Sequence, residues 1–193
     1  MAYKIALFAS GSGSNAENII RYFSEKPGIV FPLIISNKPD AFVHERAKTM
    51  GIPSFSFSKK EFDEGDKIIR LLKEYKINFI VLAGFLLKIS SPLLEAFPNK
   101  IINIHPALLP KFGGKGMYGQ HVHRAVVNAG ETQSGITIHY VNEKYDEGSI
   151  IFQAICEVLP DDTPESLAEK VHALEYLHFP GVIENIVKAS TKG

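Results

Sequence analysis

The hydrophobic positions of the chain alternate between short β-type runs and stretches with helical periodicity. Apolar runs rich in Val, Ile and Leu, which are typical of buried strands, occupy residues 3–9, 29–36, 78–83 and 101–104, and a short apolar stretch occupies residues 54–57. Between them, the spacing of apolar residues predicts helices over about 15–25, 42–50 and 61–75. Strands that alternate with helices indicate a largely parallel sheet with helices on both faces.

The pattern changes in the last third of the chain. Residues 135–141 and 149–158 are typical of two antiparallel strands joined through a turn at Asp146-Glu147-Gly148. Thr163 and Pro164 mark a helix start, and Pro180 is expected to break or kink this helix before a short final one. No repeat or linker divides the sequence. We predict a single α/β domain over residues 1–193, with a mostly parallel twisted sheet and antiparallel strands near its C-terminal part.

Composition and charge narrow the class of protein. The 21 basic residues balance the 21 acidic ones, so the chain lacks the positive surplus that marks binding to nucleic acid or an anionic membrane. No apolar run approaches the length of a transmembrane helix, and the N-terminus lacks the apolar core of a signal peptide. We expect a cytoplasmic protein without a nucleic-acid or membrane partner. The sequence leaves the oligomeric state open, a homodimer included.

The residues that could bind a metal ion do not form a convincing site. The single cysteine, Cys156, excludes internal disulfides and any zinc site built from several cysteines, and its apolar neighbours are typical of a buried side chain. His121 and His123 stand where a helix begins, and side chains two residues apart on a helix diverge. We therefore predict no metal.

The segment that carries the most chemistry is Asn103-Ile104-His105-Pro106. Pro106 cannot donate to a sheet ladder, so the chain must leave the sheet just after His105. In an open α/β sheet, ligands bind at this edge. Because side chains at i and i+2 share one side of a strand, Asn103 and His105 can both face one ligand. An amide can donate to a developing oxyanion, and an imidazole can move a proton near neutral pH.

A glycine-rich turn follows the first strand and leads into a helix, at Ser10-Gly11-Ser12-Gly13-Ser14-Asn15. Glycines allow a close backbone approach to an anion, and a helix N-terminus presents free N–H groups. We favour a phosphate site here over a capped helix without ligand. The loop also fits the dinucleotide pattern G-x-G-x-x-A, which is weak alone. The second strand ends without the acidic residue that a ribose would require, so NAD binding is the minor alternative.

Four ordered motifs together resemble the folate-dependent formyltransferases. They are the glycine loop, Val81-Leu82-Ala83-Gly84-Phe85, Asn103-Ile104-His105-Pro106-Ala107-Leu108-Leu109-Pro110 and Asp146-Glu147-Gly148. The likeness runs from about residue 3 to 180, and within the family it is strongest to the members that act on glycinamide ribonucleotide. It implies a formyltransferase catalytic domain that moves a formyl group from 10-formyltetrahydrofolate, as co-substrate, to the amine of 5'-phosphoribosylglycinamide (GAR) in purine biosynthesis.

The resemblance also implies roles for individual residues. Asn103, His105 and Asp146 match the family's catalytic trio. Its phosphate contacts match Gly13, Ser14 and Asn15, and its contacts to the rest of the ribonucleotide match Glu175 and one histidine of His121-Val122-His123, for which we take His121. The folate pocket would draw on Leu86, Leu87, Ile89, Val141 and Tyr145. Residues 111–119 are longer and more glycine-rich than the usual connection, which leaves a mobile flap and an inert surface loop as alternatives.

Two other functions remain open at this stage. A formyltetrahydrofolate hydrolase would use the same Asn-x-His-Pro core but release formate without an amine acceptor. A nucleotide-binding module would use the glycine loop alone. Binding of a folate would argue against the nucleotide-binding module. A reaction that requires an amine acceptor would argue against the hydrolase.

Overall fold

The computed structural model describes residues 2–191. The chain forms two compact units, one up to Asn103 and one from Ile104 onward, and strand β5 (Ile101–His105) crosses the boundary between them. The first unit contains the earlier parallel strands, which are β1 (Tyr3–Phe8), β2 (Ile29–Ser36), β3 (Ser54–Ser56) and β4 (Phe79–Leu82). Strand β4 and the second halves of β1 and β2 are buried, as expected for a parallel sheet, whereas the short edge strand β3 is partly exposed.

The helices of the first unit are α1 (Ser14–Phe23), α2 (Val43–Thr49), α3 (Lys59–Glu64), α4 (Asp66–Glu74) and α5 (Ser91–Ala96). The single helix predicted over 61–75 is therefore wrong, because two helices stand there. Ser58 and Glu61 form a capping box that starts α3, and Gly65 ends it in the left-handed region at φ 81°. The short helix α5 was not predicted.

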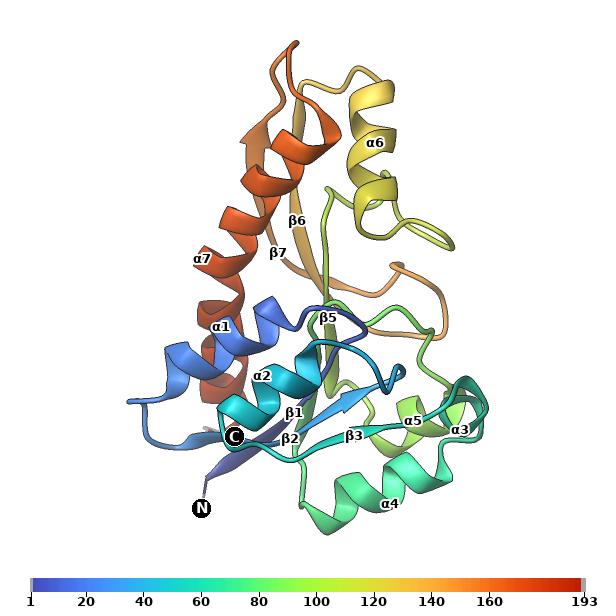
Figure 1. Ribbon diagram of the computed structural model, residues 1–193, viewed down its shortest axis with the longest axis vertical. Coiled ribbons are helices and arrows are strands. Elements are labelled where there is room, and N and C mark those ends of the chain that lie inside the picture. Colours follow the sequence, from blue (N-terminus) through green and yellow to red (C-terminus); the bar gives the residue numbers. More distant parts are fainter. Residues whose placement is uncertain (1, 192–193) are drawn as a thin grey trace. The chain divides into compact units, whose positions relative to one another are not determined.

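The second unit contains an antiparallel strand pair and two helices (Figure 1). They are β6 (Gln133–Tyr140), β7 (Ile150–Glu157), α6 (Gln120–Asn128) and α7 (Pro164–Ser190). Helix α7 packs along both strands and against α6. It is one helix rather than the predicted two: Pro180 removes one N–H from the ladder, but Phe179 and Ile183 on either side are fully buried, and this burial holds the helix together.

The hydrogen-bonded order of the strands is β3-β2-β1-β4-β5-β6-β7. The pairings among β1 to β5 are parallel, and β6 pairs with β7 in the antiparallel sense. This mixed, mostly parallel sheet with surrounding helices confirms the predicted fold class. In the first unit the chain builds outward from β1 to β3 and then returns to the other side of β1 with β4. The loops that follow β1 and β4 therefore meet at a topological switch point, where α/β sheets bind ligands.

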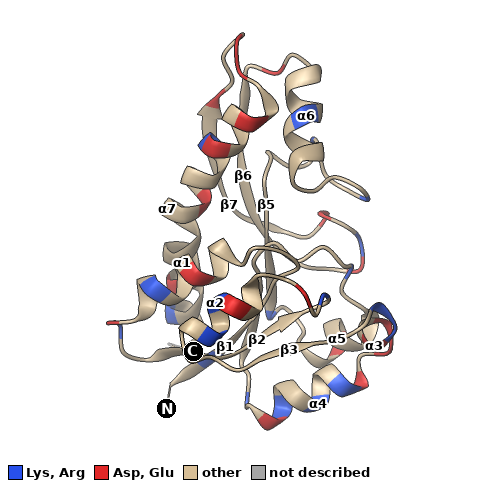
Figure 2. Cartoon of the chain, in the orientation of Figure 1, with Lys and Arg blue, Asp and Glu red and all other residues tan. Residues whose placement is uncertain are grey.

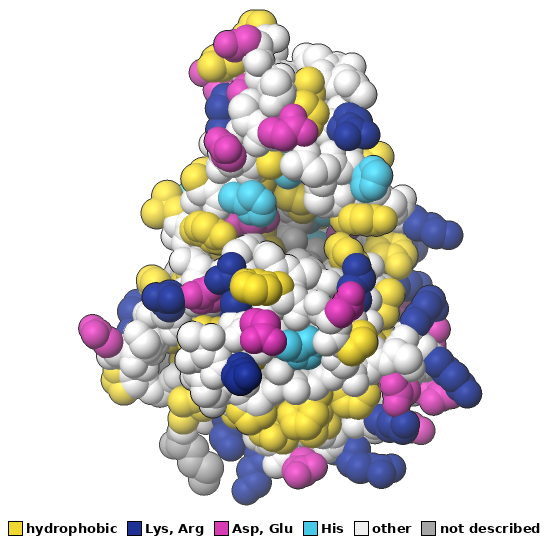
Figure 3. Space-filling view, viewed as in Figure 1, with side chains coloured by type: hydrophobic (Ala, Val, Ile, Leu, Met, Phe, Trp, Pro, Cys, Tyr) yellow, Lys and Arg dark blue, Asp and Glu magenta, His cyan; other side chains and the backbone are white. Residues whose placement is uncertain are grey.

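Charged side chains of both signs are interspersed on the surface. Helix α4 carries both signs, with an acidic residue at each end and three basic residues between them (Figure 2). The face drawn in Figure 3 likewise carries both signs side by side. Among the helices described, none combines the length and apolar character that crossing a membrane requires.

Candidate active site

His105 ends strand β5 and is almost completely buried, with 3% of its surface exposed. Its Nε2 lies 2.8 Å from the carbonyl oxygen of Phe112. Because a carbonyl can only accept, Nε2 carries the hydrogen of the neutral ring and Nδ1 carries the lone pair. Burial lowers the pKa of His105, although the Asp146 carboxylate and the Phe112 carbonyl oppose this shift. The ring is therefore a neutral base at physiological pH, with Nδ1 available to accept a proton.

Asp146 faces that nitrogen. Its Oδ2 lies 3.5 Å from Nδ1 of His105 and accepts a hydrogen bond of 2.9 Å from the N–H of Gly114. Burial alone would raise the pKa of Asp146, but its contacts with His139, His105 and the Gly114 N–H lower it. The carboxylate is thus charged at neutral pH, and a proton that arrives on Nδ1 of His105 is stabilised by it.

A second histidine, His139 at the end of β6, reaches the same carboxylate. Its Nε2 lies 3.6 Å from Oδ1 of Asp146, and its Nδ1 donates to the carbonyl of Tyr140 at 2.9 Å. The sequence analysis assigned no role to His139. The alternation along the strand indicated a polar face. Thr137 and His139 lie on one side of β6, and Ile136 and Ile138 lie on the other.

Two residues around His105 have backbone conformations that non-glycine residues rarely adopt. Phe112, which supplies the carbonyl, and Asp146, which supplies the carboxylate, both have φ 55°. Such conformations cost about 1–3 kcal/mol each and persist where surrounding contacts impose them, often at functional sites. Within residues 111–119, Phe112 and Gly114 hold His105 and Asp146 by backbone hydrogen bonds, whereas the role of the segment as a flap stays a prediction.

The segment after His105 is fixed by one buried hydroxyl. Thr137 of β6 donates to the carbonyl of Ala107 at 2.7 Å and accepts the N–H of Leu109 at 3.0 Å. Gln153 of β7 adds hydrogen bonds to Thr137 and to the Leu109 carbonyl. The antiparallel pair thereby positions the chain that leads from His105 to Phe112, and it fixes the orientation of the imidazole.

A second polar cluster surrounds Glu175 of α7. Glu175 is buried, with 5% exposed, and its Oε2 lies 2.9 Å from Nδ1 of the half-exposed His172. This hydrogen bond raises the pKa of His172. His123 of α6 is 3% exposed, and its Nδ1 has no hydrogen-bond partner among residues 2–191. Burial first, and then the charge of His172, lower the pKa of His123. The site thus holds a carboxylate and an unsatisfied ring nitrogen, both of which suit a polar ligand.

In the first unit, the glycine loop joins β1 to α1. Gly13 has φ 72° and offers no side chain to cap α1, and the hydroxyl of Ser12 accepts the N–H of Ser14 at 3.4 Å. A Cβ on Gly13 would lie 2.4 Å from Cγ2 of Val43, so only glycine fits. Ser12 is exposed and Ser14 is half-buried, and the hydroxyl of Ser12 donates to that of Ser14 at 3.3 Å. Helix N–H groups and hydroxyls at the edge of a sheet can bind a phosphate group.

The loop after β4 is tied to the glycine loop by Ser10. The Ser10 hydroxyl accepts the N–H of Leu86 at 2.8 Å, and the Ser10 N–H donates to the carbonyl of Gly84 at 3.0 Å. Leu86 is 40% exposed, whereas Ile89 is buried at 3%. Two loops that can contact ligands therefore share one anchor at the switch point.

The family model for formyl transferases matches residues 3–183. The chain belongs to the formyl transferase family.

Relatives within this family carry consistent names. The chain is 40% identical over 195 residues to phosphoribosylglycinamide formyltransferase of Bacillus subtilis, covering 98% of this chain and 97% of the relative. It is 42% identical to the chloroplastic enzyme of the same name from Arabidopsis thaliana, covering 98% of this chain and 67% of the relative. The crystal structure of phosphoribosylglycinamide formyltransferase from Anaplasma phagocytophilum matches with 34% identity and a TM-score of 0.89, covering 98% of this chain and 89% of that one. These comparisons confirm the resemblance found in the motifs.

Within this formyl transferase, the structure brings only some of the predicted site residues together. His105 and Asp146 lie close to each other, as predicted. Asn103 pairs with Leu82 of β4 two residues before His105. Of the histidines on α6, His123 lies in the electrostatic neighbourhood of Glu175 and His105, whereas the exposed His121 stacks on Tyr118 with ring centroids 5.3 Å apart. The assignment of His121 to the ribonucleotide stays a prediction, and His123 is the residue that sequence reasoning passed over.

The remaining predicted positions are placed as follows. Ser14 and Asn15 open α1 and Val141 follows β6, while Tyr145 is 38% exposed beside Asp146. Leu87 is half-buried. Cys156 is half-buried rather than buried, and burial raises the pKa of its thiol. No group of three or more metal-binding side chains occurs among the described residues.

The two polar clusters lead to opposite titration behaviour for two histidines. We expect an NMR titration of the free protein to give His105 a midpoint below the ordinary value of 6.5 and His172 a midpoint above 6.5. At pH 6.5, most of His105 is then neutral and most of His172 is charged. The ring C–H resonances, assigned with His105→Gln and His172→Gln, measure both midpoints.

Glu175→Gln is the control for this titration. It removes the charge that stabilises the His172 imidazolium, so the His172 midpoint should fall while that of His105 changes less. Midpoints in the reverse order would contradict the two assignments.

Proposed function

We propose that this chain transfers the formyl group of 10-formyltetrahydrofolate to the primary amine of GAR, giving formyl-GAR and tetrahydrofolate in de novo purine biosynthesis. The observation that carries the proposal is the buried pair of neutral His105 and ionised Asp146 at the end of β5. Supporting it, relatives at about 40% identity over nearly the whole chain are named for this activity.

The reaction assigns one task to each residue of the trio. The neutral amine of GAR attacks the formyl carbon and forms a tetrahedral oxyanion. The amide of Asn103 donates to that oxyanion, a contribution of about 10²–10³ in rate for one such donor. Nδ1 of His105 accepts the proton lost by the amine, and Asp146 stabilises the resulting imidazolium. His105 then returns the proton to N10 of the folate as the C–N bond breaks.

The chemistry needs neither a metal nor a covalent enzyme intermediate. Every proton that leaves the amine reappears on the folate nitrogen, and the formyl carbon passes directly between two bound substrates. Holding two substrates in reacting geometry supplies much of the rate in such transfers. We therefore propose that residues 1–193 act as one catalytic domain in the cytoplasm, with only small molecules as substrates.

We propose the following binding positions. The phosphate of GAR binds at Gly13, Ser14 and Asn15, where a helix N-terminus and the Ser14 hydroxyl are available, with the Ser12 hydroxyl beside it. The ribose or amine portion of GAR contacts Glu175 and His121. His121 lies on helix α6, which also carries the buried His123. The folate binds at the loop after β4, through Leu86, Leu87 and Ile89, and at the segment beside Asp146, through Val141 and Tyr145.

One assay tests this function against its alternatives. Purified protein is mixed with 10-formyltetrahydrofolate, and loss of the formyl donor is followed with and without GAR. Loss that requires GAR, with formation of formyl-GAR, is the expected result. Loss of the donor at the same rate without GAR would instead identify a hydrolase. Binding of a nucleotide without any folate binding would identify a nucleotide-binding module.

A further inference from the structure

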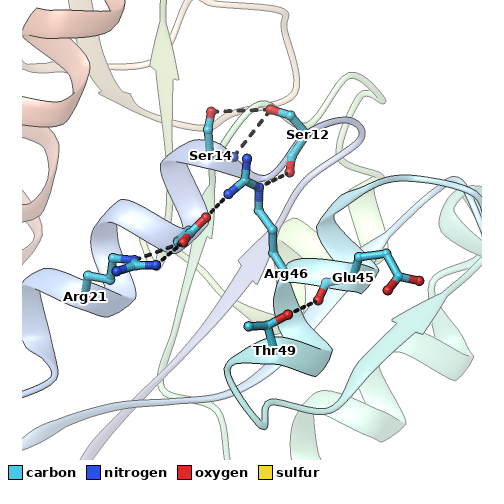
Figure 4. A network of polar contacts seen from close by, with 7 residues as sticks. Ser12, Ser14, Arg21, Glu45, Arg46 and Thr49 are labelled. Atoms are coloured by element: carbon cyan, nitrogen blue, oxygen red, sulfur yellow. Dashed lines mark hydrogen bonds and ion pairs between the residues drawn. The ribbon is translucent and has the colours of Figure 1, made fainter.

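Arg46 of α2 holds the glycine loop from the side of the neighbouring helix (Figure 4). Its Nε donates to the carbonyl oxygen of Ser12 at 2.8 Å. Another nitrogen of the same guanidinium pairs with the carboxylate of Glu17 on α1. The ion pair is largely sheltered, because 30% of the Arg46 side chain and 18% of the Glu17 side chain are exposed. One planar group thus joins the loop to the first turn of the helix that follows it.

This contact determines which backbone groups the loop offers to a ligand. The carbonyl of Gly11 accepts the N–H of Val43 at 3.1 Å, and the carbonyl of Ser12 accepts Arg46. Both carbonyl oxygens, which would repel an anion, are therefore held toward α2. The Ser14 N–H at the start of α1 makes a long hydrogen bond of 3.4 Å to the Ser12 hydroxyl. This side of the loop therefore offers N–H groups and hydroxyls rather than carbonyl oxygens to an anion, an arrangement typical of backbone anion sites.

The same cluster supplies positive charge to a loop that has none. Residues 10–15 contain no lysine or arginine. Glu17 pairs with Arg21 as well as with Arg46, so one carboxylate stands between two guanidinium groups and the cluster keeps one net positive charge. The Arg21 side chain is 75% exposed and its guanidinium bonds Glu17, whereas Arg46 bonds the Ser12 carbonyl and so brings this charge to the loop.

We propose that Arg46 is a positioning residue for the phosphate of the ribonucleotide substrate. Arg46 favours phosphate binding in two ways: it holds the Ser12 carbonyl away from the anion, and it places its own positive charge next to the loop. The inference rests on the proposed function, since it takes the glycine loop as the site of the GAR phosphate. It predicts that Arg46 affects ribonucleotide binding and leaves binding of the folate unchanged.

Arg46→Met tests this inference, with Arg21→Met as the matched control. Both variants remove one positive charge and one partner of the same carboxylate, but only Arg46 contacts the loop. Loss of one hydrogen bond from a charged donor predicts that the KM for GAR rises at least about tenfold in Arg46→Met. The KM for 10-formyltetrahydrofolate should stay within about twofold of wild type, and Arg21→Met should change neither constant beyond that range.

A second readout does not depend on catalysis. The dissociation constant of inorganic phosphate, measured by calorimetry, should rise in Arg46→Met in the same direction as the KM for GAR. A wild-type protein that binds phosphate but transfers no formyl group would overturn the proposed function while leaving this inference standing. An Arg46→Met protein whose KM and phosphate affinity match those of Arg21→Met would overturn the inference alone.

Arg46→Lys covers the case in which the methionine variant does not fold. Lysine keeps the charge beside Glu17 but lacks the planar fork that bonds the carboxylate and the Ser12 carbonyl together. A folded Arg46→Lys protein should show a raised KM for GAR with an unchanged KM for the folate. Wild-type constants for both substrates in that variant would contradict the positioning role.

Discussion

Asp146→Asn should lower kcat by about 10²–10⁴-fold, the range that general acid–base contributions cover. The amide has nearly the shape of the carboxylate, but it lacks the charge that stabilises a protonated His105 at 3.5 Å. Because this charge matters only when the imidazole has accepted a proton, the loss should appear in kcat rather than in substrate binding. Steady-state kinetics with both substrates measures kcat and the two KM values.

Asp162→Asn is the matched control for this substitution. Asp162 lies in the same unit and pairs with Lys170, and hydrogen bonds from Lys170 and from Leu159 N–H help to lower its pKa to about 2. Its replacement removes an ion-paired carboxylate without touching His105, so kcat should stay within about threefold of wild type. Near-normal turnover in Asp146→Asn would remove this carboxylate from the mechanism.

His105→Gln is expected to cause a loss of similar size, about 10²–10⁴-fold in kcat. The glutamine amide can still donate a hydrogen bond to the Phe112 carbonyl, which His105 contacts at 2.8 Å. It cannot accept a proton, so the amine of the substrate loses its base. The rate of a single turnover, with both substrates bound at saturation, isolates this chemical step from binding and product release.

Two further variants sharpen the interpretation of His105→Gln. His44→Gln replaces a histidine that bonds Ser54 and Ser56 in the first unit, and it should leave the single-turnover rate unchanged. His139→Gln tests the other imidazole beside Asp146, and it should lower the rate less than His105→Gln does. If His139→Gln has the larger effect, the proton passes through His139, and the role assigned to His105 is wrong.

Much of the fold could be predicted because its signals are local. Strand β2 spans residues 29–36 as the β-branched run indicated, and the antiparallel pair followed from the alternation around Asp146-Glu147-Gly148. The errors in helix boundaries arose where the effect of a single glycine or proline depends on the residues packed around it. Gly65 interrupts a continuous apolar stripe by its left-handed conformation, whereas Pro180 fails to interrupt one because its neighbours Phe179 and Ile183 are buried.

The candidate site was predictable to the extent that it lies within short motifs. Asn103 and His105 belong to one strand, so spacing alone places them on one side. The contacts of Asp146 with His139 and Gly114 depend on left-handed residues in two loops, and no periodicity reveals such conformations. His123 rather than His121 is buried because of the rotation of α6 about its axis, which requires the positions of its neighbours.

The most direct test of the account is a crystal structure with GAR and a folate analogue that carries a non-transferable formyl group. We expect the Asn103 amide nitrogen and Nδ1 of His105 to lie about 3 Å from the formyl oxygen and the GAR amine, respectively. The Asp146 carboxylate should still face that imidazole. A complex in which the formyl carbon is bound away from Asn103 and His105 would contradict the proposed mechanism.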